Sequence, residues 1–332
     1  MPHRIVFFGT SDFSIPSLRA LLADQRFEVV AVVTKPDQPI GRHQTITPPP
    51  VKTLAQEHSA PVYQFEKIKT EETFETLRNL SLRGSAKQSM DCRVSSDSTR
   101  NDNIVDAYVV VSYGKIIPQR ILDLPKRGCV NVHGSLLPRW RGASCVQAAI
   151  AAGDEKSGVT IMMMDAEMDH GDILAQAETT VGLDETGGTL HDRLAQLGAD
   201  NLPDVLADYL DGKVVPKPQN HDQATFCKLL SRDDGKIDWS KPAEEIERLV
   251  RAYDPWPGTW TEWDGKRIKI LASRSAQSQL SAADAIGTLK AANTSLLVKC
   301  GDGNALEILE LQPEGKKAMP AKEYLAGHTP SS

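Results

Sequence analysis

Short apolar runs alternate with segments of helical periodicity along the first two thirds of the chain. Apolar runs of strand length stand at residues 4–9, 27–34, 104–111, 128–133, 158–165 and 171–181. Between them, stretches such as SIPSLRALLADQ carry apolar residues at helical spacing. Uniformly apolar strands that alternate with amphipathic helices are typical of sheets buried on both faces. The pattern therefore predicts an α/β domain with a doubly wound parallel sheet.

The pattern changes after a long helical stretch at residues 186–210. Residues 211–228 are polar, proline-bearing and without either periodicity, as expected of a linker. A further helical segment then leads to short apolar runs such as KRIKILASR and ALEILELQP, at the spacing of an all-β unit. We predict a first domain over residues 1–210, the linker, and a small barrel-like domain over residues 229–328.

Residues 80–102 fit neither pattern. This serine-rich segment, which contains SLRGSAKQSMDCRVSSDSTRND, interrupts the first domain between a helix and a strand. Structureless loops of this length are uncommon inside compact domains. We expect a disordered surface insertion with no part in the chemistry; the alternative is translated sequence that the working protein lacks.

Composition narrows the class of protein only a little. The chain has 332 residues, 40% of them hydrophobic and 25% charged, which is ordinary for a globular protein. No apolar run approaches the roughly 18 residues needed to cross a bilayer. The opening MPHRIVFFGT has no presequence layout, and the five scattered cysteines form no CxxC pair. These features predict a cytoplasmic protein without a metal site. At a net charge of −6, nucleic-acid binding would need a local basic patch.

Polar groups crowd the end of one apolar strand, in the stretch NVHGSLLPRWRG that begins at Asn131. Asn131 and His133 project to the same side of the strand because side chains alternate. Ligands of open α/β sheets gather at the carboxyl ends of the strands, where this pair stands. An amide beside an imidazole suits a developing oxyanion, although Asn-x-His alone also suits a strand end whose side chains bind loop backbone.

A second polar cluster, MDHGD, follows the next strand and contains Asp169. Because consecutive strand ends lie side by side in βαβ units, we expect Asp169 to approach His133. The carboxylate would favour the imidazolium and accept the proton that an attacking amine loses. The sequence has no serine elbow, nucleophilic cysteine motif or metal-ligand spacing. The set therefore suits direct acyl transfer without a covalent enzyme intermediate.

Longer motifs resemble those of the folate-dependent formyltransferases over nearly the whole chain. The matching stretches are VFFGTSDF, TKPDQPIGR, PPPVK, VVVSYGKIIP, NVHGSLLPRWRGAS, GVTIMMMDAEMDHGD and LQPEGKKAM. The resemblance implies a Rossmann-like N-terminal domain that holds 10-formyltetrahydrofolate and an OB-like C-terminal barrel that contacts tRNA. It makes Asn131, His133 and Asp169 the catalytic set. The implied folate-binding residues are Ser135, Leu136, Leu137 and Pro138, with Tyr113, Gly114 and Ile116 in the pterin pocket.

The implied reaction is attack by the α-amine of methionyl-initiator tRNA on the formyl carbon, for translation initiation by a monomeric enzyme. The residues expected to contact tRNA are Arg42, Arg139, Arg141, Lys316 and Lys317. His43 and Gln44 stand where the family often has lysines after Arg42, which should weaken the electrostatic part of binding. Three alternatives use the same features: formylation of a purine-pathway or amino-sugar amine, hydrolysis of formylfolate, and RNA binding without catalysis.

Overall fold

The chain divides into two units. The computed structural model describes residues 1–41, 43–83, 104–263, 265–277, 280–281, 283–292 and 295–327. Unit 1 comprises Met1–Arg141, Gly158–Glu178 and Asp192–Thr225, and unit 2 comprises Gly142–Ser157, Thr179–His191 and Phe226–Ser332. Most of the segment predicted as a linker therefore groups with unit 1, and two stretches of the predicted first domain group with the barrel.

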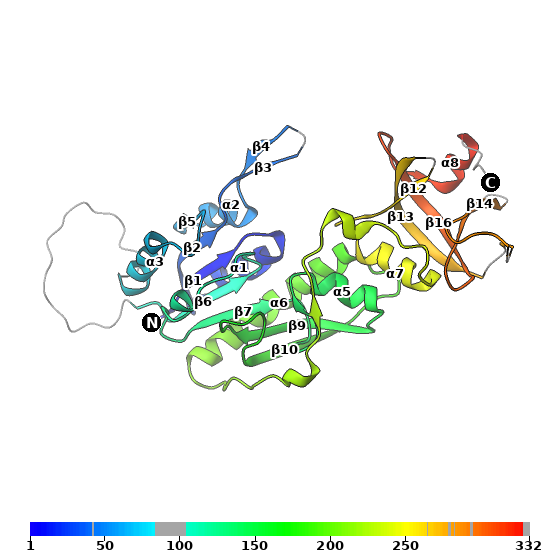
Figure 1. Cartoon of the computed structure of the whole chain (residues 1–332). Helices are drawn as coiled ribbons and strands as arrows, with labels where there is room; N and C mark the ends of the chain where they lie inside the picture. Colours follow the sequence, from blue (N-terminus) through cyan, green and yellow to red (C-terminus); the bar gives the residue numbers. More distant parts are fainter. Residues whose placement is uncertain are drawn as a thin grey trace, which may run out of the picture. The chain divides into compact units, whose positions relative to one another are not determined.

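A seven-stranded sheet in the order β10-β9-β7-β6-β1-β2-β5 forms the centre of unit 1 (Figure 1). Its strands are β1 (His3–Gly9), β2 (Phe27–Thr34), β5 (Val62–Gln64), β6 (Ala107–Val111), β7 (Cys129–His133), β9 (Lys156–Met163) and β10 (Ile173–Thr180). The first five strands along the chain pair in parallel. β9 runs antiparallel to β7, with His133 opposite Thr160. The sheet is therefore mostly parallel, as predicted, and β9 is the strand that departs from the prediction by running antiparallel to β7.

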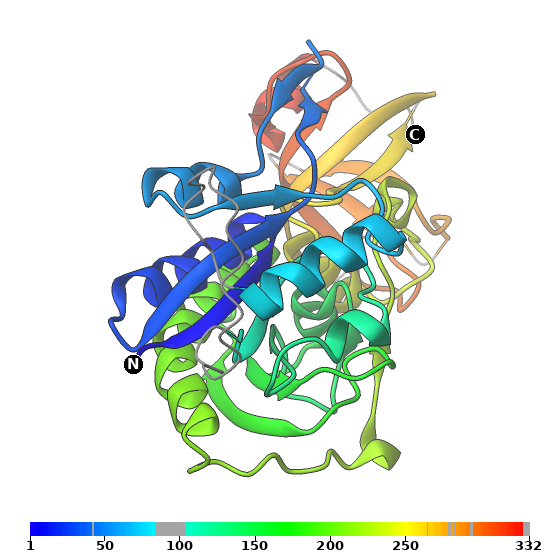
Figure 2. The ribbon, with the colours of Figure 1, turned by 90° about the vertical axis from the view of Figure 1, so that its left-hand side faces the viewer.

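Helices cover both faces of this sheet (Figure 2). They are α1 (Ile15–Ala23), α2 (Pro50–Glu57), α3 (Glu71–Arg83), α4 (Gln119–Leu122) and α6 (Gly187–Leu210), with short 3-10 turns η1 (Asp12–Ser14) and η2 (His221–Gln223). Leu77 of α3 and Ile121 of α4 pack with Phe8 and Tyr108 on one face. On the other face α6 approaches β7 closely, since a Cβ added at Gly198 would lie 2.8 Å from Val132 Cγ1. The two layers confirm the doubly wound arrangement.

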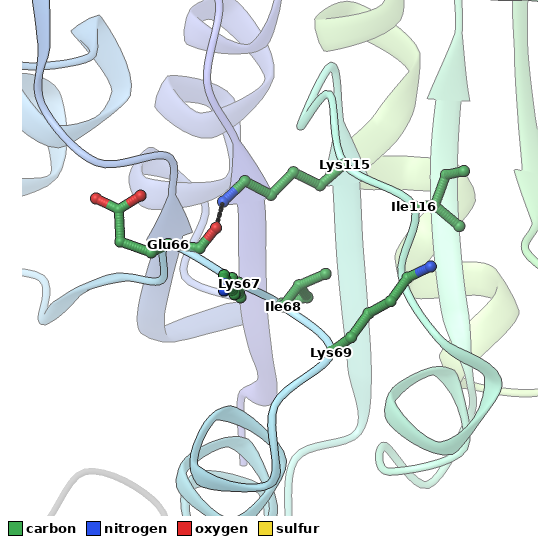
Figure 3. Close-up of a pocket in the computed structure, with 6 residues that line it drawn as sticks. All are labelled: Glu66, Lys67, Ile68, Lys69, Lys115 and Ile116. Carbon is green, nitrogen blue, oxygen red and sulfur yellow. Dashed lines mark hydrogen bonds between the residues drawn. The ribbon is translucent and has the colours of Figure 1, made fainter.

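A pocket of about 410 Å³ opens beside the segment that follows β6 (Figure 3). It is lined by Glu66, Lys67, Ile68, Lys69, Lys115 and Ile116. Lys115 Nζ donates hydrogen bonds to the carbonyl oxygens of Phe65 and Glu66, 2.5 and 2.8 Å away. Burial lowers the pKa of the Lys115 ammonium. Lys115 therefore ties the two sides of the pocket together.

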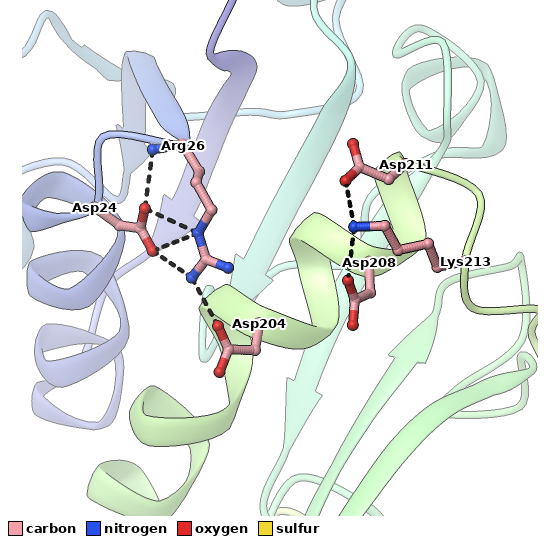
Figure 4. Close-up of polar contacts among 6 residues, drawn as sticks. All are labelled: Asp24, Arg26, Asp204, Asp208, Asp211 and Lys213. Atoms are coloured by element: carbon pink, nitrogen blue, oxygen red, sulfur yellow. Dashed lines mark hydrogen bonds and ion pairs between the residues drawn. The ribbon is translucent and has the colours of Figure 1, made fainter.

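Ion pairs join α6 to the turn after α1 (Figure 4). The Arg26 guanidinium bonds both Asp24, at 2.6 Å, and Asp204 of α6, at 2.8 Å. Arg26 holds the pKa of the Asp24 carboxyl below its usual range. Further along, Lys213 bridges Asp208 and Asp211. These groups are exposed or half-buried at the surface, where ion pairs contribute little to the stability of a fold.

The last turn of α3 is tied to the sheet by side chain and backbone. The Ser81 hydroxyl hydrogen-bonds the buried Tyr108 hydroxyl, and the Val105 amide donates to the Ser81 carbonyl over 2.9 Å. Burial raises the pKa of Tyr108 well above its usual range. Residues 80–83, which we predicted in the insertion, are thus helical. Residues 84–102 of that predicted insertion lie outside the described residues.

We expect Tyr108→Phe to lower the free energy of unfolding by about 1–2 kcal/mol. The substitution leaves the buried Ser81 hydroxyl without its partner, and an unsatisfied buried polar group costs about this much. Urea unfolding followed by circular dichroism measures the change, with Tyr63→Phe as a half-buried control. A change below about 0.3 kcal/mol would show that the Ser81–Tyr108 bond does not stabilise the fold.

Two short strands form a hairpin in unit 1. β3 (Gln38–Ile40) and β4 (Thr45–Thr47) pair antiparallel, with Gln38 opposite Thr47. Arg42, which stands between them in the sequence, lies outside the described residues. Its predicted contact with tRNA is therefore not located by the structure.

Unit 2 contains an antiparallel sheet in the order β12-β13-β16-β15-β14, with β17 beside β16. The strands are β12 (Thr259–Trp263), β13 (Lys266–Ala276), β14 (Leu289–Ala292), β15 (Ser295–Lys299), β16 (Ala305–Pro313) and β17 (Met319–Pro320). The other elements of this part of the chain are α5 (Cys145–Ala152), η3 (Arg232–Gly235), α7 (Ala243–Ala252) and α8 (Ala321–Gly327), with the two-residue strands β8 (Arg141–Gly142) and β11 (Phe226–Cys227). Ile246 and Val250 of α7 pack with Ile268, Leu306 and Ile308 of the sheet. This half-barrel confirms the predicted β domain.

Candidate active site

Strand β7 presents Asn131 and His133 on the same side, as the alternation predicts. Val130 and Val132 point to the opposite, α6-covered face and are buried. Asn131 is half-buried, whereas His133 is only 7% exposed. In the part of the chain that the structure describes, the Asn131 side-chain amide makes no hydrogen bond. Its N–H donors are therefore available to a group that approaches the end of β7.

Both ring nitrogens of His133 face an acceptor oxygen. Nε2 lies 3.0 Å from the carbonyl oxygen of Trp140, and Nδ1 lies 3.6 Å from Asp169 Oδ1. A neutral imidazole donates at one nitrogen only, and the imidazolium donates at both. Only a ring with hydrogens on both nitrogens offers a donor to each of these two oxygens. Asp169 and His133 thus form the juxtaposition that the sequence predicts, at ion-pair distance.

The loop that carries Asp169 approaches its neighbours closely. Asp169 adopts φ +50°, in the left-handed region that aspartate tolerates better than bulkier residues. Two residues on, a Cβ at Gly171 would stand 2.1 Å from the Met163 carbonyl oxygen, so only glycine fits there. The HGD sequence therefore lets the loop fold tightly against the end of β9.

The residues of the predicted folate loop are of two kinds. Some are buried and hold the loop by hydrogen bonds, and others keep part of their surface accessible to a ligand. Ser135 is buried and donates to the Arg139 carbonyl over 2.6 Å. Leu137 is also buried, and its amide donates to Thr160 Oγ1 over 3.0 Å. Leu136 and Pro138 are half-buried. A ligand at this loop would reach the Leu136 and Pro138 side chains before those of Ser135 and Leu137.

The three residues predicted for the pterin pocket occupy different surroundings. Tyr113 is 2% exposed and packs edge-on against Phe8, and burial raises its pKa to about 12. Gly114 adopts φ +71°, and a Cβ there would meet Lys35 Nζ. Ile116 is 69% exposed and lines the pocket of Figure 3. Of the three residues, Ile116 lines this pocket, and Tyr113 belongs to the core.

The predicted tRNA-contacting arginines beside the site also differ. Arg139 is exposed, and its guanidinium stacks over the Trp140 ring at 4.6 Å. Arg141 is 4% exposed, and it bonds Gln219 and His221 inside unit 1. This burial contradicts the prediction that Arg141 contacts tRNA, because a buried guanidinium bonded to protein does not meet a phosphate. In unit 2, Lys316 and Lys317 are exposed after β16.

The buried Gln219 and the exposed Gln176 are polar groups at the site that the sequence did not indicate. Gln176 donates to the Leu137 carbonyl oxygen and to Thr160, and Gln219 donates to the loop of Asp169. Gln219 lies in an aperiodic segment without a recognisable motif, so a single sequence offers no signal for it.

Among the described residues, no group of His, Cys, Asp and Glu is arranged to hold a metal ion, and no helix is long and apolar enough to cross a membrane.

Comparison with known proteins defines the class of this protein. Residues 3–206 match the family model described as formyl transferase, and residues 229–329 match its C-terminal domain. The chain therefore belongs to the formyl transferase family. Within it, the chain is 42% identical over 325 residues to the methionyl-tRNA formyltransferase of Geotalea daltonii, covering 98% of this chain and 95% of the relative. It is 40% identical over 324 residues to that of Geobacter sulfurreducens, covering 98% and 93%.

Solved structures share the fold. An N-formyltransferase from Helicobacter canadensis, in complex with folinic acid and dTDP-3-aminofucose, superposes with a TM-score of 0.63 at 15% identity, covering 94% of this chain and all of that one. HypX from Aquifex aeolicus, in complex with tetrahydrofolic acid, gives 0.59 at 16% identity. This chain covers 47% of the length of HypX. At these identities the likeness establishes the architecture of an α/β domain and a β domain.

Proposed function

We propose that this chain transfers the formyl group of 10-formyltetrahydrofolate to the α-amino group of methionyl-initiator tRNA. The observation that carries the proposal is the identity of about 40% with methionyl-tRNA formyltransferases over 98% of the chain. The His133–Asp169 pair beside the Asn131 amide supports it, because an acyl transfer to an amine needs these functions. The folate is a co-substrate, and no step requires a metal.

In the proposed reaction, the methionyl nitrogen forms a bond to the formyl carbon while the carbonyl electrons move onto oxygen. Asn131 donates a hydrogen bond to this oxyanion, and the nearby positive charge of the His133 imidazolium stabilises it. The ammonium proton passes to Asp169. The carbonyl then re-forms as the bond between the formyl carbon and N10 of the folate breaks, and Asp169 gives the proton to N10. The half-buried surfaces of Leu136 and Pro138 would hold the folate near β7.

A labelled-formyl assay tests the proposal. Purified protein is mixed with radiolabelled 10-formyltetrahydrofolate and one of three acceptors: methionyl-initiator tRNA, a charged elongator tRNA, or an amino-sugar nucleotide. We expect label on the initiator tRNA alone. Label on the amino sugar would establish the alternative acceptor, and release of formate in every arm would establish hydrolysis.

We also propose that Arg139, Lys316, Lys317 and Arg42 bind the tRNA backbone. Exposure supports this role for the first three, and the family resemblance supports it for all four.

We expect Lys316→Ala with Lys317→Ala to reduce the salt dependence of tRNA binding. Each lost phosphate contact lowers the slope of log K against log salt by about one. Filter binding from 50 to 200 mM salt measures it, with Lys322→Ala as control; an unchanged slope would remove these lysines from the interface.

A further inference from the structure

The position of the Asp169 carboxylate depends on a loop without regular structure. Residues 164–172 connect β9 to β10, and within them Asp169 adopts a left-handed backbone conformation. Conformations of this kind persist where surrounding contacts determine them. The carboxylate must stay near His133 Nδ1, 3.6 Å away, to balance the imidazolium and accept a proton. The groups that hold this loop backbone therefore bear on the proposed chemistry.

Gln219 holds the loop from a distant part of the chain. It is 6% exposed, and its side-chain amide nitrogen donates to two loop carbonyls. The acceptors are the carbonyl oxygens of Asp169, at 2.9 Å, and Gly171, at 2.7 Å. Both N–H groups of the amide are used in this way. Gln219 thus bridges the backbone on either side of residue 170.

Arg141 fixes the orientation of the Gln219 amide. Its Nη2 donates to Gln219 Oε1 over 2.7 Å, and its Nε lies 3.3 Å from the same oxygen. Nη2 also lies 2.8 Å from His221 Nδ1, which accepts because a guanidinium has only donors. With the amide oxygen turned to Arg141, the amide nitrogen must face the loop. The buried arginine therefore acts on the loop through Gln219.

The same two side chains connect the partners of His133. Trp140, whose carbonyl oxygen bonds His133 Nε2, is the residue before Arg141. Asp169, which faces His133 Nδ1, carries one of the carbonyls that Gln219 bonds. Arg141 and Gln219 thus join the two segments that contact opposite edges of the imidazole.

A ring stack adds a second attachment of this loop. The imidazoles of His170 and His221 lie parallel, with centroids 4.0 Å apart and 7° between their planes. His170 Nδ1 also lies 2.7 Å from Asp165 Oδ2 within the loop. The segment that contains Gln219 and His221 therefore contacts both the backbone of the loop, through Gln219, and a side chain of the loop, through the stacking of His221 on His170.

We propose that Gln219 is a positioning residue for formyl transfer, which holds the Asp169 carboxylate against His133 by bonding the backbone of the Asp169 loop. Arg141 orients Gln219 for this purpose. The inference rests on the proposed function, because it gives Gln219 a role in the step that Asp169 and His133 carry out. It also explains why an arginine of the motif PRWRG is buried.

Gln219→Met keeps the length of the side chain and removes both donors. We expect kcat to fall about 10- to 100-fold, since a displacement of about 1 Å in a catalytic group costs this much. KM for folate and tRNA should change less than about threefold. In an Asp169→Asn background the same substitution should lower kcat less than about threefold, because the group that Gln219 positions is already lost. Equal losses in both backgrounds would overturn the proposal.

Two further variants separate the arms of the network. Gln219→Glu keeps an acceptor for Arg141 and loses the donors to the loop, so it should be as slow as Gln219→Met; near-normal turnover would overturn the proposal. It also carries the test if the methionine variant loses its fold, which thermal unfolding reveals. Gln223→Met, at an exposed position four residues further on, is the matched control and should keep wild-type turnover.

Crystal structures of the wild-type protein and Gln219→Met provide a readout independent of the acceptor. The distance from His133 Nδ1 to Asp169 Oδ1 should rise to more than about 5 Å in the variant, toward the limit of a strong charge interaction. An unchanged distance would overturn the positioning role. If the wild-type protein does not formylate methionyl-initiator tRNA but the distance rises, the proposed acceptor fails and the role of Gln219 in holding the loop stands.

Discussion

Asn131→Ala is expected to lower kcat for formyl transfer by about 10²–10³. The Asn131 amide stands at the end of β7 with no hydrogen-bond partner among the described residues, beside His133. A donor in this place stabilises the negative charge that develops on the formyl oxygen, and loss of one such donor typically has this effect. Single-turnover rates with saturating folate and methionyl-initiator tRNA measure it.

The controls for this variant separate catalysis from folding and binding. KM should change little, because the oxyanion forms only during the reaction. Asn201→Ala removes an amide from α6 in the same unit, where it bonds the Leu197 carbonyl, and should keep turnover. A loss below about threefold for Asn131→Ala would remove Asn131 from the proposed oxyanion site.

Asp169→Asn is expected to lower kcat by about 10²–10⁴, the range that a general acid–base group contributes. The amide keeps the shape of the carboxylate but neither balances the imidazolium of His133 nor takes up the proton of the amine. The variant should bind folate normally, because the loop bonds through its backbone to Gln219 remain. Rapid-quench measurement of the transfer step determines the change.

Asp165→Asn provides a matched control in the same loop. Asp165 pairs with His170, which stacks on His221, and makes no contact with His133 that the structure shows. We expect its turnover to fall several-fold at most. If the two aspartate variants lost turnover equally, the ion pair with His133 would not be the reason that Asp169 matters.

The strand that carries the site could be predicted from the sequence, because the side to which each of its side chains points depends only on neighbouring residues. Alternation within CVNVH places Asn131 and His133 on one side whatever the rest of the chain does. The direction of β9 could not be predicted, because an apolar run reads alike in parallel and antiparallel pairing. The prediction that Asp169 meets His133 was therefore correct in its outcome, although the antiparallel pairing of β7 with β9 replaces the βαβ unit on which it was based.

The environment of Arg141 shows a different limit of the sequence. An arginine in a loop after a proline is most often exposed, and charged residues are seldom buried without partners. Its partners, Gln219 and His221, stand 78 and 80 residues further along the chain in a segment without periodicity. Only the folded chain brings the Arg141 guanidinium within hydrogen-bond distance of the Gln219 amide and the His221 imidazole. The exposed Lys316 and Lys317, by contrast, needed no distant partner to be placed correctly on the surface.

The bond between Ser81 and Val105 has a consequence for how this chain tolerates change. The two residues stand next to each other in space, so the fold imposes the same pair of end points on whatever polypeptide separates them. The length of the chain between Ser81 and Val105 can therefore change during evolution while β6, the strand that follows Val105, keeps its register in the sheet.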